Sequence, residues 1–143
     1  MPIYETSVVV RAAGERLWSV LSDISRWSEW TPTITRIEAL GPASLEIGAR
    51  YRVWQPKLIP AIWTVTALEP QRGFVWESRV LGTRVRAEHS IFSEKSESFR
   101  VVLQVGYSGA IGSAIGLVYG RLTRQYLALE ADSLRRRAES DEE

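Results

Sequence analysis

Apolar and polar residues alternate along the start of the chain. From Ile3 to Arg11, the residues Tyr4, Thr6, Val8 and Val10 fall on one face. A period of two with many β-branched residues predicts a strand. Six later segments also read as strands, at about 34–40, 48–55, 61–69, 73–81, 83–93 and 97–107. Short turns separate most of them, which predicts antiparallel neighbours.

Helical periods interrupt this pattern twice. Leu17, Trp18 and Leu21 have helical spacing within Ala13 to Ser22. Ser22-Asp23 offers a cap for a second short helix through Trp27, and Pro32 ends it. We therefore expect two short helices directly after the first strand.

The C-terminal region predicts one long amphipathic helix from Gly109 to about Glu139. Its apolar residues recur every three to five positions, and they are Ile111, Ile115, Val118, Leu122, Tyr126, Leu129 and Leu134. Gly112, Gly116 and Gly120 form a row on one face, which indicates close approach to a curved sheet or room left for a ligand. The residues from about 135 to 143 are charged, and we expect a solvated, fraying end.

These elements predict an α+β fold with a seven-stranded antiparallel sheet. Such a sheet can bury one face by curling around the long helix, which leaves a cavity between sheet and helix. The length of 143 residues and the 45% hydrophobic fraction suit a single domain over 1–143.

Several short motifs carry a family resemblance. They are Ala12-Ala-Gly-Glu-Arg-Leu-Trp18, Asp23-Ile-Ser-Arg-Trp27-Ser-Glu-Trp30-Thr-Pro32, Gly48-Ala-Arg-Tyr51 and Trp63-x-Val65-x-x-x-Glu69-Pro70. Together with the element order, they resemble the START-like SRPBCC superfamily with its helix-grip fold, and within it the polyketide cyclase/dehydrase-like group. The resemblance implies a deep, largely apolar pocket for a hydrophobic small molecule. Fold predicts such a pocket far better than it predicts chemistry.

The inward faces of the strands supply the candidate pocket residues. Alternation places Tyr51 and Val53 inward, and His89 among apolar neighbours. In the segment 61–69, Trp63, Val65 and Ala67 share a face. The predicted ligand-binding residues are Trp30, Tyr51, Val53, Trp63, Trp76, His89, Leu103, Tyr107, Ile115 and Tyr119. Trp18, Trp27 and Trp30 are expected to anchor the N-terminal helices, with Trp30 as the contact to ligand.

His89 and Tyr107 are the candidate catalytic residues. The ordinary pKa of histidine, about 6.5, suits a general acid or base; the alternative is a neutral core histidine with a hydrogen-bonded ring. A tyrosine hydroxyl can orient a ligand carbonyl or hydroxyl, or it can be a core aromatic. Because His89 is the single histidine, we expect no multi-histidine metal site. No Gly-x-Ser-x-Gly elbow is present, which argues against a hydrolase triad.

Composition excludes several classes. Eighteen Lys and Arg against seventeen Asp and Glu leave a formal net charge of +1, which disfavours a nucleic-acid partner. Without cysteine there is no disulfide, thiolate nucleophile or zinc-thiolate site. The N-terminal residues lack a secretory pattern and no apolar run reaches about 20 residues, so we expect a cytoplasmic protein with no membrane segment. No cofactor is expected.

Three functions remain open. The first is binding of a hydrophobic small molecule such as a lipid, a polyketide or an isoprenoid-like compound. The second is a cofactor-independent cyclase or dehydratase that uses His89 and a pocket tyrosine for proton transfer. The third is a co-chaperone-like interaction module, for which the loop Gln55–Pro60 or the glycine-bearing helix face would be exposed. That loop is either a lid at the pocket mouth or a hairpin connection. A homodimer through the exposed sheet or helix is a further option.

Overall fold

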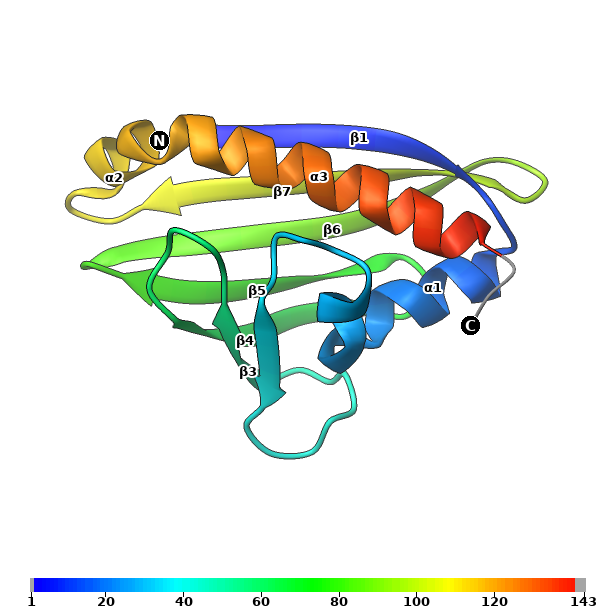
Figure 1. The fold of residues 1–143 in the computed structure, drawn as a ribbon, viewed down its shortest axis with the longest axis horizontal. Helices are drawn as coiled ribbons and strands as arrows, with labels where there is room; N and C mark the ends of the chain where they lie inside the picture. The colour runs from blue at the N-terminus through cyan, green and yellow to red at the C-terminus, as the bar shows by residue number, and fades with distance from the viewer. Residues whose placement is uncertain (1, 141–143) are drawn as a thin grey trace.

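The computed structural model describes residues 2–140 and contains the expected seven-stranded antiparallel sheet (Figure 1). The strands are β1 (Ile3–Arg11), β2 (Arg36–Ala39), β3 (Arg50–Trp54), β4 (Ala61–Glu69), β5 (Gly73–Val80), β6 (Thr83–Lys95) and β7 (Ser98–Ser108). Their order in the sheet is β1-β7-β6-β5-β4-β3-β2. From β2 to β7, strands that follow one another in sequence are therefore neighbours in the sheet. β1 lies beside β7 and forms one edge of the sheet, and β2 forms the other edge.

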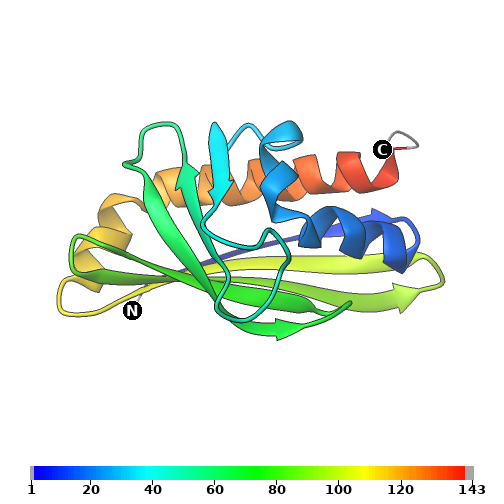
Figure 2. The ribbon, with the colours of Figure 1, turned by 90° about the horizontal axis from the view of Figure 1, so that it is seen from below.

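The helices lie on one face of this sheet. They are α1 (Gly14–Ser22), the 3-10 helix η1 (Ile24–Glu29), α2 (Gly112–Val118) and α3 (Gly120–Glu139). Figure 2 shows α1 and α3 together above the curved strands, and α3 contacts β1, β7 and α1. The predicted α+β architecture, with a sheet curled around the C-terminal helix, is confirmed.

The predicted inward faces hold the core. Each of the following side chains is at most 4% exposed: Tyr51, Val53, Trp76, His89, Val101 and Leu103. The exception is β4, where the register shifts between Val65 and Ala67. Because such an irregularity changes the side to which later residues point, Val65 is buried while Ala67 is exposed. The expectation that Ala67 shares the inward face is therefore wrong.

The predicted single C-terminal helix is two helices, α2 and α3, which meet at Tyr119. Here the chain lies against the first strand. A Cβ on Gly116 would lie 2.8 Å from the Pro2 side chain, and one on Gly120 would lie 2.5 Å from the Tyr4 hydroxyl. The Tyr4 O–H donates to the Gly116 carbonyl over 2.8 Å. The glycine row thus permits close approach of the helix to the sheet, as one of the two interpretations expected.

The N-terminal helices differ in detail from the prediction. The second short helix is a 3-10 helix, and the Asp23 side chain makes no capping hydrogen bond to it. Trp27 is 1% exposed, and its indole N–H donates to the Leu21 carbonyl over 3.0 Å. This bond satisfies the one polar group of a buried tryptophan, so Trp27 joins η1 to the end of α1.

The end of α3 is more ordered than expected. Residues 135–139 complete the helix, and Ala138 is only 2% exposed. The expected fraying therefore does not describe them; residues 141–143 lie outside the described part of the chain. The strands predicted at 34–40 and 48–55 are also shorter in the structure, where β2 is Arg36–Ala39 and β3 is Arg50–Trp54.

Candidate functional site

A cavity of about 260 Å³ lies between the inward face of the sheet and the C-terminal helices. Its walls come from β3 to β7, from α2 and α3, and from the loop that joins β3 to β4. Most of the lining is apolar, and aromatic rings of Trp27, Trp63 and Trp76 form part of the wall. Such a lining, with few polar groups, is typical of a site for a small organic molecule.

The predicted pocket residues fall into two groups. Eight of them line the cavity: Val53, Trp63, Trp76, His89, Leu103, Tyr107, Ile115 and Tyr119. Trp30 and Tyr51 do not. Tyr51 is fully buried, its ring lies against Trp76, and its hydroxyl donates to the Ala43 carbonyl. Trp30 lines a separate polar cleft, and Trp27 takes the place at the cavity that we expected for Trp30.

His89 lies in a cluster of aromatic rings. Its imidazole stacks on Phe74, the residue opposite it in the sheet, at 4.3 Å between ring centroids and 12° between planes. The centroid of Trp27 is 5.4 Å away. Burial lowers the pKa of His89 to about 4. A hydrogen bond with the Phe74 backbone has a smaller effect, which raises this pKa. The ring is therefore neutral near pH 7, and such a weak base is poorly suited to proton abstraction there.

The Nδ1 atom of His89 is buried without a hydrogen-bond partner among residues 2–140. A buried polar atom that lacks a partner is uncommon and costs free energy. The stacked, desolvated ring favours the interpretation of His89 as a neutral core histidine. The hydrogen bond expected for such a histidine is not made by its Nδ1 atom.

Tyr107 is engaged with the helix. Its hydroxyl and the Thr123 hydroxyl form a hydrogen bond of 2.6 Å, in which either group can donate. Burial raises the pKa of Tyr107 above its ordinary value near 10, so the phenol stays protonated near neutral pH. This bond ties the end of β7 to α3.

The sheet register separates the two catalytic candidates. His89 lies opposite Leu103, whereas Tyr107 lies opposite Val85. Four residues along a strand correspond to about 13 Å at about 3.3 Å per residue. His89 and Tyr107 therefore line one cavity without being within direct reach of each other.

The cavity wall also contains a carboxyl group that we did not predict from the sequence. Glu130 lines the cavity together with Tyr119, Leu122 and Tyr126, and residues three or four apart on a helix share a face. Burial raises the pKa of Glu130 from 4.5 to about 7, and it is the one cause of the shift. The spacing of Tyr119, Tyr126 and Glu130 was the available signal.

The loop between β3 and β4 closes one side of the cavity. Leu58 and Ile59 contribute to the lining. The Tyr126 hydroxyl donates to the Pro56 carbonyl, which joins the loop to α3. Gln55 also lines the cavity, and its side-chain amide donates to the Thr33 carbonyl over 3.2 Å.

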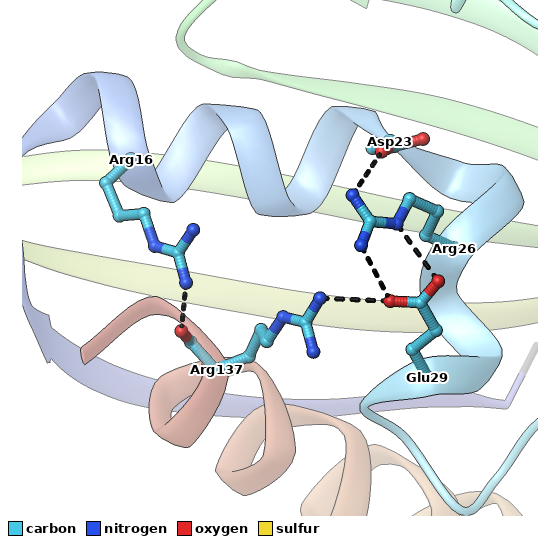
Figure 3. Close-up of polar contacts among 5 residues, drawn as sticks. All are labelled: Arg16, Asp23, Arg26, Glu29 and Arg137. Carbon is cyan, nitrogen blue, oxygen red and sulfur yellow. Dashed lines mark hydrogen bonds and ion pairs between the residues drawn. The ribbon is translucent and has the colours of Figure 1, made fainter. Parts of the chain in front are cut away.

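A second, polar cleft lies where α1, η1 and the end of α3 meet (Figure 3). Glu29 accepts hydrogen bonds from Arg26 and Arg137, both at 3.0 Å, and Arg16 donates to the Arg137 carbonyl over 2.8 Å. The hydrogen bond from Arg26 is the largest of the effects that lower the pKa of Glu29. These pairs link three helices, and we interpret the cleft as a structural junction.

Two further observations bear on function. Within residues 2–140, no group of three metal-ligating side chains comes together. None of the helices in that part of the chain is long and apolar enough to cross a membrane.

A family described as polyketide cyclase / dehydrase and lipid transport matches the chain over residues 1–139. The chain belongs to this family. The predicted resemblance to the START-like SRPBCC superfamily and its polyketide cyclase/dehydrase-like group is thereby confirmed. A comparison with curated proteins finds no match.

Solved structures of low sequence identity share the family's fold. A START superfamily protein from Mycobacterium smegmatis is 17% identical with a TM-score of 0.73, and the alignment covers 96% of this chain and 97% of that one. Norcoclaurine synthase from Thalictrum flavum, in complex with dopamine and hydroxybenzaldehyde, is 13% identical with a TM-score of 0.78 and coverages of 99% and 88%. The di-domain ARO/CYC BexL is 15% identical with a TM-score of 0.70, and the alignment covers 97% of this chain and 47% of BexL.

Proposed function

We propose that this member of the family binds a small, largely apolar molecule in the cavity between the sheet and α3. The observation that carries the proposal is the cavity itself, with its wall of aromatic and aliphatic side chains and few polar groups. Burial in such a site contributes about 0.8 kcal/mol per CH₂ group, so a chain of about ten carbons gains about 8 kcal/mol before the cost of association. The family description, which includes lipid transport, agrees with a ligand of this kind.

The β3–β4 loop serves this function as a cover. Leu58 and Ile59 face the cavity, although Ile59 remains 63% exposed. The hydrogen bond from Tyr126 to Pro56 holds the loop against α3. Opening of this loop would admit the ligand. Because Leu58 and Ile59 contact the cavity, their apolar side chains do not require a protein partner to explain them. This weakens the hypothesis that the loop is a protein-interaction site.

Acid–base catalysis by His89 and Tyr107 has less support. The His89 ring is neutral and stacked, and the Tyr107 hydroxyl is already bonded to Thr123. Although norcoclaurine synthase and BexL have the same fold, fold alone does not carry a reaction from one protein to another. We therefore place a cyclase or dehydratase activity second.

A neutral fluorescent probe tests the binding function. N-phenyl-1-naphthylamine becomes bright in an apolar site, and we expect the wild-type protein to bind it. Ala87 lines the cavity and is 7% exposed, so Ala87→Phe places a phenyl ring inside. Ser90→Phe adds the same ring on the opposite face of β6 and is the matched control.

We expect Ala87→Phe to weaken probe binding at least tenfold and Ser90→Phe to leave it within about twofold of the wild type. Circular dichroism verifies that both variants are folded. Absence of binding by the wild type would refute the proposal. Equal affinities of a folded Ala87→Phe variant and the wild type would mean that the probe binds elsewhere.

A further inference from the structure

Glu130 is an acid without a partner in an apolar cavity. Among residues 2–140, no hydrogen bond or ion pair to its carboxyl group is found, and burial is the one cause of its raised pKa. The Glu130 side chain is half-buried in the cavity wall, so its carboxyl group loses part of its hydration and gains no hydrogen bond or ion pair from the described residues in return. We therefore expect the ligand to supply the group that pairs with the Glu130 carboxyl.

The remaining lining shows which charge that partner carries. Of the described residues that line the cavity, none is lysine or arginine. His89 is neutral near pH 7 because burial lowers its pKa to about 4. Glu88 is also part of the wall, but its carboxylate forms an ion pair with the Arg86 guanidinium, with 2.9 Å between Oε2 and Nη1. An anionic headgroup would thus meet no positive charge in the cavity and one negative charge whenever Glu130 is ionised.

The aromatic wall points to the same headgroup. Trp27, Trp63 and Trp76 line the cavity, and the faces of tryptophan rings attract cations. The cavity wall therefore contains both aromatic faces and a carboxyl group, the two kinds of group that attract an organic ammonium.

We propose that the ligand of this cavity is an apolar molecule that carries a basic nitrogen, and that Glu130 is the residue that binds this nitrogen. This inference rests on the proposed binding function and adds the chemical class of the ligand. It also excludes fatty acids and other anionic lipids as preferred ligands, because their headgroups would face the Glu130 carboxylate. Neutral lipids would bind through apolar contacts alone.

Other titratable groups do not supply the same charge. Those in the lining are His89, Tyr107, Tyr119 and Tyr126 besides the paired Glu88. The charged residues on the segments that contact α3 are Glu5 and Arg11 on β1, Glu15 and Arg16 on α1, Arg26 and Glu29 on η1, Arg100 on β7 and Lys57 on the β3–β4 loop. None of these contributes to the pKa of Glu130, for which burial is the one cause.

Three probes of equal chain length test the inference: decylamine, decanol and decanoate. Their affinities are measured by displacement of N-phenyl-1-naphthylamine at pH 8 and pH 6 and at constant ionic strength. For a carboxyl group with a pKa of about 7, the ionised fraction falls about tenfold between these pH values. Decylamine remains cationic at both, so we expect it to bind about tenfold more tightly at pH 8, while decanol binding stays constant.

Variants identify the group responsible. Glu130→Gln removes the charge with little change in shape, and Glu94→Gln removes a charge at an exposed position of β6. We expect decylamine to bind the wild type at pH 8 at least tenfold more tightly than decanol, and decanoate to bind most weakly. Glu130→Gln should abolish the preference for the amine and keep decanol binding, whereas Glu94→Gln should resemble the wild type.

The outcomes separate this inference from the binding function. If all three probes bind equally, or if decylamine binds Glu130→Gln as tightly as the wild type, the inference is overturned and the apolar site remains. Preferred binding of decanoate would overturn it as well. If no probe binds, the binding function fails and the inference with it.

Discussion

Replacing Glu130 by glutamine measures what the carboxyl group costs the folded protein. The side chain lines the apolar cavity, where burial raises its pKa from 4.5 to about 7. The folded state therefore holds the proton more tightly than the unfolded chain does. Between pH 4.5 and 7 the unfolded chain has lost this proton while the folded protein retains it, so stability must fall as the pH rises through this range.

The size of the effect follows from the two pKa values. Each tenfold change in proton affinity corresponds to about 1.4 kcal/mol, so the move from 4.5 to about 7 amounts to about 3 kcal/mol. This penalty is absent below pH 4.5, grows as the pH rises, and is complete above pH 7. Glutamine does not titrate, and the Glu130→Gln variant should lack this pH dependence.

Urea unfolding of both proteins from pH 4.5 to 8.5 provides the assay. We expect the stability of Glu130→Gln to exceed that of the wild type by about 3 kcal/mol more at pH 8.5 than at pH 4.5. The control Glu94→Gln changes an exposed carboxyl group and should follow the wild type. If the stabilities of Glu130→Gln and the wild type run parallel with pH within about 0.5 kcal/mol, the Glu130 carboxyl group is not desolvated and its pKa is not raised.

Two further substitutions test other parts of the structure. Because burial lowers the pKa of His89 to about 4, the wild type should lose about 2 to 3 kcal/mol relative to His89→Leu as the pH falls from 7 to 4.5, measured by urea unfolding; equal losses would contradict the buried neutral ring. Gly120→Ala should destabilise the protein by about 1 to 3 kcal/mol, because its Cβ would lie 2.5 Å from the Tyr4 hydroxyl. Gly106→Ala is the control, since its Cβ would make an ordinary contact of 3.7 Å, and thermal unfolding that ranks both variants equally would dispute the close approach at Gly120.

The alternation of residues was sufficient to predict the sheet. In the strand with Tyr51 and Val53 polar and apolar residues alternate over 50–53, and in the strand with His89 they alternate over 84–88. Burial confirms the inward faces of both strands. The bulge after Val65 could not be predicted, because the residues around it are compatible with either face. A local irregularity depends on the pairing with the neighbouring strand, which the sequence of one strand does not contain.

The break at Tyr119 was hidden for a similar reason. The apolar period runs through it without a proline, so the sequence predicts one helix. The contacts of Gly116 and Gly120 with Pro2 and Tyr4 join residues more than 100 positions apart, and no local pattern reports them.

The inward faces of the strands predicted most of the strand residues that line the cavity. Trp76, His89 and Leu103 were placed at the cavity from their faces alone. Glu130 was missed, because a glutamate within a charged helical region is usually exposed to solvent. Trp30 and Tyr51 were assigned wrongly, since the direction of a large side chain depends on which neighbours fill the space around it.

Intermolecular NOEs between N-phenyl-1-naphthylamine and the methyl groups of the protein test the binding cavity most directly. Leu103 and Leu127 lie on opposite walls of the cavity, on β7 and α3. Leu117 and Val118 are the most exposed apolar residues of α2, at 72% and 76%. If the probe binds in the cavity, NOEs to the methyl groups of Leu103 and Leu127 are expected. NOEs confined to Leu117 and Val118 would contradict binding in the cavity, because the probe would then bind the surface and leave the cavity unused.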